Sequence, residues 1–221
     1  MRSPTRLSAS TALPKSKAVE GSRAGAAGSP FPWEGAAVFF LVACFGCAAD
    51  LATKNWVFAW RGYAPGQSNI WWIVEGYIGI ETAVNYGALF GIGQGFTAVF
   101  VTLSFVALAG VIYYLFVIGI ARHLLYTTIG GMVTGGILGN LYDRLGLWSV
   151  PGVTNPYGVR DWIRLSYGDF TWPNFNIADS LLVCGALLVL WQSFRSGPPE
   201  AITQNPSDEA GGSQTDITTD G

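Results

Sequence analysis

The sequence Asn174-Phe175-Asn176-Ile177-Ala178-Asp179 leads directly into the apolar segment 180–191. An aspartate, Asp179, therefore lies one turn inside a segment that otherwise has the composition of a membrane-spanning helix. A carboxylate near the middle of a membrane costs about 2.5–3.5 kcal/mol on insertion scales, and less near an end of the helix. Such a residue needs a partner or a function, and the rest of the chain offers residues for both.

The composition is that of a membrane protein. Half of the 221 residues are hydrophobic and only 12% are charged, whereas ordinary globular chains carry about 25% charged residues. The formal net charge of −2 gives no reason to expect nucleic-acid binding. The single histidine, His123, excludes a His-based metal cluster. The sequence C-x-x-C at Cys44 and Cys47 lies inside an apolar run, and we interpret both as small apolar side chains.

Four apolar segments predict four transmembrane helices, because about 20 residues cross the hydrocarbon core of a membrane. The spans are expected at about 35–58, 95–120, 124–142 and 175–194, within a membrane domain covering 33–195. The flanking segments 1–32 and 196–221 lack apolar periodicity and are predicted to be disordered tails, the first basic and the second acidic. The predicted fold class is therefore a mainly α membrane protein.

The connections between the spans are predicted to carry a small sheet and a loop. Apolar side chains recur at every second position over 71–84, which is typical of a half-buried strand, and Gly76 and Gly79 suit a turn or a bulge. We expect a small extracytoplasmic sheet, or cradle, at about 62–93. Asn85, which follows the alternating segment, could belong to a turn or reach into a site. The segment 145–174 is predicted to be an extracytoplasmic loop.

Basic residues predict the orientation of the chain. The N-terminal tail, the Arg122-His123 loop and Arg195 mark one side of the membrane, and short Lys- and Arg-rich segments favour the cytoplasm. Both termini are then cytoplasmic, and the sheet lies on the opposite face. Four aspartates are predicted to gather on that extracytoplasmic face: Asp50, Asp143, Asp161 and Asp179. Lys54, four residues after Asp50 in the first span, is expected to form an ion pair with it.

Two neighbouring aspartates would explain Asp179. A pair about 3 Å apart cannot ionise fully, so one carboxyl keeps a proton while the other acts as a base on water. Such a pair can hydrolyse an amide. Composition and spacing leave the partner of Asp179 open among Asp143, Asp161 and Asp169. They also leave open a transporter or ion-conducting protein that uses the aspartates as relay groups.

Five sequence blocks carry a resemblance that chooses among these possibilities. The blocks are Asp50-Leu51-Ala52-Thr53-Lys54, Asn85-Tyr86-Gly87-Ala88-Leu89-Phe90, Gly135-Gly136-Ile137-Leu138-Gly139-Asn140-Leu141-Tyr142-Asp143-Arg144, Val159-Arg160-Asp161-Trp162-Ile163 and Phe175-Asn176-Ile177-Ala178-Asp179. In this order they resemble the motifs of the lipoprotein signal peptidases (signal peptidase II), which are bacterial four-span aspartyl peptidases.

The resemblance implies an aspartyl endopeptidase that removes signal peptides on the amino side of a lipid-modified cysteine in prolipoproteins. It implies a catalytic dyad of Asp161 and Asp179, without metal or cofactor. It also implies a set of site-shaping residues: Asp50, Lys54, Asn85, Gly136, Asn140, Asp143, Arg144, Asn176 and Ala178. Asp143 is expected to pair with the adjacent Arg144.

The implied setting is the inner membrane of a bacterium, with a monomeric enzyme whose partners are prolipoprotein signal peptides and membrane lipid. The chain departs from the family in a long segment, 145–160, before Asp161. We call this segment the inserted segment. It leaves Asp169 as an alternative dyad partner. Asp161 is favoured because Val159 and Ile163 flank it as in the family's motif.

Overall fold

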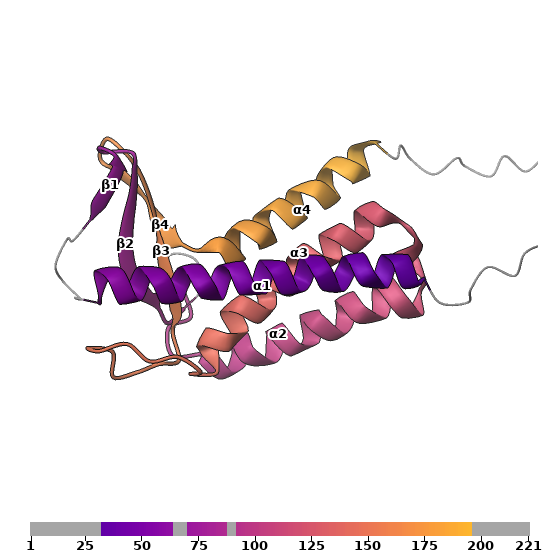
Figure 1. Cartoon of the computed structure of the whole chain (residues 1–221), viewed down its shortest axis with the longest axis horizontal. Helices are drawn as coiled ribbons and strands as arrows, with labels where there is room; N and C mark the ends of the chain where they lie inside the picture. Colours follow the sequence, from indigo (N-terminus) through magenta and orange to yellow (C-terminus); the bar gives the residue numbers. More distant parts are fainter. Residues whose placement is uncertain (1–31, 64–69, 88–91, 196–221) are drawn as a thin grey trace, which may run out of the picture. The chain divides into compact units, whose positions relative to one another are not determined.

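All four predicted spans are helical (Figure 1). The structure is a computed structural model that describes residues 32–63, 70–87 and 92–195. The predicted tails, and the parts of the predicted cradle at 64–69 and 88–91, lie outside the described residues. The helices are α1 (Trp33–Arg61), α2 (Thr97–Ile112), α3 (Leu124–Arg144) and α4 (Ile177–Arg195). A π-helical turn, η2 (Tyr113–Val117), continues α2, and a short 3-10 helix, η3 (Ile120–Arg122), leads to α3.

Among the described residues, three helical segments are long and apolar enough to cross a membrane: Trp33–Arg61, Thr97–Val117 and Ile177–Arg195. The third predicted span, α3, is 21 residues long, but its glycines and its polar C-terminal end lower its hydropathy. It packs against each of the other three helices and buries Gly130, Gly135 and Asp143 among other residues. A helix surrounded by protein presents little surface to lipid, so it needs fewer large apolar side chains. That α3 crosses the membrane stays a prediction.

Glycines allow α3 to approach its neighbours closely. A Cβ atom at Gly135 would lie 2.8 Å from the carbonyl oxygen of Ala43 on α1, and one at Gly136 would lie 2.7 Å from the carbonyl oxygen of Ala178 on α4. Only a residue without a side chain fits such contacts, as in other closely packed membrane helices. The beginning of α4 is thereby held against the C-terminal half of α3, just before Asn140.

A four-stranded antiparallel sheet lies at one end of the helices, next to the C-terminal end of α1 and the beginning of α4 (Figure 1). Its strands follow one another in chain order: β1 (Trp71–Val74), β2 (Ile78–Asn85), β3 (Val159–Tyr167) and β4 (Phe170–Phe175). The first two confirm the strand pattern predicted over 71–84. Gly76, with φ of 76°, occupies the turn between them, a left-handed conformation that favours glycine.

The prediction of a loop over 145–174 is wrong for its second half. β3 and β4 form a hairpin there, and β3 pairs with β2. The alternation was present in Asp161, Ile163, Leu165 and Tyr167, which occupy one set of alternate positions, but Asp161 interrupts its apolar pattern. Pro173 lies in β4, which is an edge strand of the described sheet and tolerates a missing N–H.

Candidate active site

Asn176 and Asp179 together cap the start of α4. The side-chain oxygen Oδ1 of Asn176 accepts the backbone N–H of Asp179 at 2.9 Å, and Oδ2 of Asp179 accepts the backbone N–H of Asn176 at 3.1 Å. This reciprocal arrangement is a capping box, which satisfies two N–H groups that a helix start leaves without partners. The aspartate one turn inside α4 therefore has a local structural reason and a fixed orientation.

Asp161 lies on β3 and is 2% exposed. Its Oδ1 accepts a hydrogen bond of 2.7 Å from the side-chain amide of Asn176, and Asn85 of β2 also hydrogen-bonds to it. Asn176 therefore contacts both aspartates, one through each end of its amide. Of the partners that the sequence left open for Asp179, Asp161 shares a direct hydrogen-bonding partner with it, Asn176.

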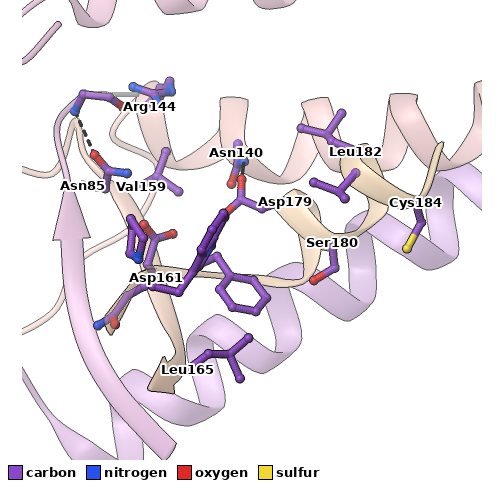
Figure 2. Close-up of a pocket in the computed structure, with 16 residues that line it drawn as sticks. Asn85, Asn140, Arg144, Val159, Asp161, Leu165, Asp179, Ser180, Leu182 and Cys184 are labelled. Atoms are coloured by element: carbon purple, nitrogen blue, oxygen red, sulfur yellow. Dashed lines mark hydrogen bonds between the residues drawn. The ribbon is translucent and has the colours of Figure 1, made fainter. Parts of the chain in front are cut away.

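Both carboxylates line one pocket of about 560 Å³. Figure 2 shows Asp161 and Asp179 at this pocket together with Asn140, while Leu182 and Cys184 follow farther along α4. Arg144, Asn85, Asn174 and Ser180 also contribute polar side chains to the lining. The other walls are largely apolar and come from β3, β4 and α4: Leu165, Trp172, Phe175, Leu182 and Val183. The pocket thus joins two carboxylates to an apolar extension.

Burial, followed by the negative charge of Asp179, raises the pKa of Asp161 well above its usual value. Lys54 and the hydrogen bonds from Asn176 and Asn85 oppose this rise and do not cancel it. A carboxyl group in such a position keeps its proton to a higher pH than a surface aspartate does. The site is therefore suited to hold one proton between two aspartates.

A buried ion-pair network lies behind the carboxylates. Lys54 Nζ is 2.6 Å from Oδ2 of Asp50 and 3.1 Å from Oδ2 of Asp143, and all three side chains are fully buried. The predicted pair between Asp50 and Lys54 is confirmed. Lys54 also donates to Oδ1 of Asn140 at 3.0 Å, which turns the amide N–H of Asn140 toward Asp179, at 2.8 Å from its Oδ1.

Asp143 does not form the predicted ion pair with Arg144. Its carboxylate pairs with Lys54 and, at 2.7 Å, with Arg160. Neighbouring residues on a helix point about 100° apart, so adjacent side chains do not face each other. Arg144 instead donates to the carbonyl oxygen of Gly87 at 2.9 Å, and its guanidinium carbon lies 4.4 Å from the ring centre of Phe100.

The remaining predicted residues have distinct places. Asn85 accepts the N–H of Gly87 at 3.0 Å and also lines the pocket, so it belongs to a turn and to the site. Ala178 donates its N–H to Oδ1 of Asp50 at 2.9 Å. Asp169 is exposed in the turn between β3 and β4 and is not among the residues that line the pocket. No role was predicted for Arg160, although a basic residue directly before Asp161 was a signal.

Comparison with known protein families gives a match over residues 42–195 to the model described as signal peptidase (SPase) II. This chain belongs to the signal peptidase II family. The matched region contains every residue of the site described above. Membership makes the chain a protease, and its apolar helices make it an integral membrane protein.

Individual relatives agree with the signal peptidase II assignment. A lipoprotein signal peptidase of Rhodopirellula baltica is 52% identical over 170 residues, which cover 76% of each chain. One of Rhodococcus jostii is 32% identical over 154 residues, covering 69% of this chain and 70% of the relative. A solved structure described as a bacterial membrane enzyme shares the fold, with a TM-score of 0.60 and 22% identity over 82% of this chain and 95% of the other.

Proposed function

We propose that this protein is an aspartic endopeptidase that removes signal peptides from prolipoproteins on the amino side of a lipid-modified cysteine. The observation that carries the proposal is the placement of Asp161 and Asp179 in one pocket, with Asn176 hydrogen-bonded to both. The family, whose relatives are named lipoprotein signal peptidases, supports this substrate class.

The two carboxyl groups take different roles. Asp161, whose pKa is raised by burial and by Asp179, holds the proton and acts as the general acid. Asp179, which accepts hydrogen bonds from Asn140 and from the backbone of Asn176, acts as the general base. It removes a proton from a water molecule, whose oxygen attacks the scissile carbonyl carbon while Asp161 protonates the carbonyl oxygen. Collapse of the resulting diol breaks the C–N bond, and the departing amine takes up a proton from the dyad.

The shape of the pocket agrees with this substrate class. An apolar extension along α4 suits a hydrophobic signal peptide or the acyl chains of a modified cysteine, and Arg144 at the polar end offers N–H donors to substrate carbonyl groups. The relay alternative predicts acids spread through the depth of the membrane. Asp50, Asp143, Asp161 and Asp179 instead gather at one end of the described helices, which counts against transport.

We place the protein in the inner membrane of a bacterium, as a monomer that crosses the membrane four times. Both termini are then cytoplasmic, and the pocket opens at the extracytoplasmic face. The positions of Arg122 and Arg195, at the ends of η3 and α4 away from the pocket, support this orientation. The sheet then lies beside the membrane, where it can hold an extended substrate.

The experiment that tests the function is cleavage of a diacylglyceryl-modified prolipoprotein by the purified full-length protein in detergent, followed by mass spectrometry of both products. The expected products are an intact signal peptide and a lipoprotein that begins with the modified cysteine. The same prolipoprotein without its lipid serves as the control and should remain largely uncut. Failure to cut the modified substrate, or cleavage at another bond, would contradict the proposal.

A further inference from the structure

Arg160, the residue before Asp161 on β3, is a buried cation whose side chain is 2% exposed. A buried guanidinium is stable only when it is paired and hydrogen-bonded. Its Nη2 and Nε lie 2.7 and 3.0 Å from Oδ1 of Asp143 on α3, and its Nη1 lies 2.6 Å from Oδ1 of Asn55 on α1. One side chain therefore ties the strand that carries Asp161 to two helices.

The backbone of Arg160 is fixed as well. Its N–H donates to Oδ2 of Asp143 at 2.9 Å, and its carbonyl oxygen accepts a hydrogen bond of 3.4 Å from the amide of Asn176. The same amide nitrogen of Asn176 donates to Asp161. The backbone N–H and the backbone carbonyl of Arg160 are thus both held by residues outside the sheet.

Trp148 of the inserted segment covers the ion pair between Arg160 and Asp143. This tryptophan is 7% exposed and lies with its ring centre 5.0 Å from the guanidinium carbon of Arg160. The indole N–H donates to the carbonyl oxygen of Asp143 at 3.2 Å, and the ring packs edge-on against Phe58 of α1. Stacking on an aromatic face and exclusion of water both strengthen a buried Arg–carboxylate pair.

We propose that Arg160 is a positioning residue for Asp161, and that Trp148 of the inserted segment shields the pair between Arg160 and Asp143 from water. The inference rests on the proposed function. Arg160 is not among the residues that line the pocket, and side chains of neighbouring strand residues point to opposite faces. It therefore acts through Asp161 and does not touch the substrate.

Replacing Arg160 by lysine separates geometry from charge. The buried network contains two carboxylates, Asp50 and Asp143, and two cations, Lys54 and Arg160, and Arg160→Lys preserves this balance. A lysine has one ammonium group and cannot reproduce a planar fork that reaches Asp143 and Asn55 together. Because a displacement of about 1 Å at a reacting group can cost about 100-fold in rate, we expect kcat per folded molecule to fall by about that factor with KM unchanged.

A second variant keeps the test decisive if Arg160→Lys does not fold. Asn55 is exposed, so Asn55→Ala should fold while it removes the acceptor of Nη1. We expect its kcat to fall about tenfold, the loss that corresponds to one hydrogen bond of a charged group, again with KM unchanged. The matched control is Arg164→Lys. The wild-type Arg164 lies on the same strand, pairs with Glu81, and has a side chain that is 22% exposed. This substitution should change kcat by less than about twofold.

The measurement is kcat and KM on the diacylglyceryl-modified prolipoprotein, scaled to the folded fraction of each variant, with Asp161→Asn in the same series. A merely structural role would lower the folded fraction and leave kcat per folded molecule unchanged. Wild-type kcat in folded Arg160→Lys, or in Asn55→Ala if the lysine variant does not fold, overturns the inference. An equal loss in Arg164→Lys overturns it too. Wild-type cleavage by Asp161→Asn would overturn the proposed function itself, whereas an inactive Asp161→Asn beside an active Arg160→Lys rejects only the positioning role.

Discussion

One side chain, Asn176, is hydrogen-bonded to both residues of the proposed dyad, to the carboxylate of Asp161 and to the backbone N–H of Asp179. Its oxygen caps α4 by accepting the N–H of Asp179, and its amide nitrogen donates to Asp161 at 2.7 Å. An asparagine can do both because it carries an acceptor and a donor on one planar group. Helix start and catalytic geometry are therefore set by the same residue.

Substitutions at Asn176 should separate these two contributions. Serine retains an N-cap oxygen but has no amide nitrogen to reach Asp161, whereas alanine has neither. We expect Asn176→Ser to lower kcat about 10–100-fold, the range for hydrogen bonds to charged groups. Asn176→Ala should lose as much activity and in addition about 1 kcal/mol of unfolding free energy relative to Ser. Unfolding temperatures and initial rates of both variants check this. Equal stability of the two would contradict the capping role.

The raised pKa of Asp161 predicts how stability depends on pH. A carboxyl group whose folded-state pKa is raised binds more protons in the folded state, so its contribution is present below the ordinary aspartate pKa and is lost as pH rises through the raised value. The Asp161→Asn variant does not lose stability in this way, because an asparagine side chain does not titrate. Its unfolding temperature relative to wild type should therefore increase as the pH rises from about 4, the ordinary aspartate pKa, through the raised pKa of Asp161.

The control for this measurement is Asp169→Asn, which removes an exposed aspartate from the same hairpin. Its unfolding temperature should follow that of the wild type across the pH range. If the difference in unfolding temperature between Asp161→Asn and wild type does not change with pH, then burial of the Asp161 carboxylate does not destabilise the folded protein.

At the scale of elements, α3 is the helix against which the others are placed. Its glycines permit backbone contact with α1 and α4, and its C-terminal end supplies Asn140 and Asp143 to the site. The apolar composition of the segment 124–142 predicted this helix. The sequence did not show which neighbours the glycines face, because that depends on contacts between distant segments.

A single methyl group should test this packing. A Cβ at Gly135 would meet the carbonyl oxygen of Ala43 at 2.8 Å and the backbone nitrogen of Cys47 at 3.2 Å, and backbone atoms cannot move aside cheaply. Gly135→Ala is expected to cost about 1–3 kcal/mol of stability. Gly110→Ala on α2, where a Cβ meets nothing within 4 Å, is the control and should be neutral or slightly stabilising. Equal unfolding temperatures for the two variants would contradict the proposed close contact.

The sheet shows where local pattern was insufficient. β1 and β2 were predicted because their alternation is nearly uninterrupted, whereas β3 was interpreted as part of a loop. Its positions 160 and 161 carry charged residues. Their buried side chains are held by partners on α1 and α3 and by Asn176, the residue directly before α4. Tertiary contacts, an ion pair for Arg160 and hydrogen bonds for Asp161, therefore reverse the usual preference of charged side chains for solvent. A single sequence does not reveal such partners.

For the molecule as a whole, the central prediction is that the site and the Arg122 end lie on opposite sides of the membrane. With 21 residues, α3 is about 30 Å long, which is the thickness of a hydrocarbon core. In a chain freed of its native cysteines, Asp169→Cys should react with a membrane-impermeant maleimide added to spheroplasts. His123→Cys should react only after the membrane is permeabilised. The opposite pattern would invert the proposed orientation.

The proposed dyad of Asp161 and Asp179 is tested most directly by the rate at which aspartate variants cleave a diacylglyceryl-modified prolipoprotein. Asp161→Asn and Asp179→Asn should each lose about 100–10,000-fold in kcat, the range for removal of a general acid or base, while remaining folded. Asp169→Asn should cleave at the wild-type rate. Near-wild-type cleavage by Asp179→Asn, or by Asp161→Asn together with an inactive Asp169→Asn, would contradict the assignment of the dyad.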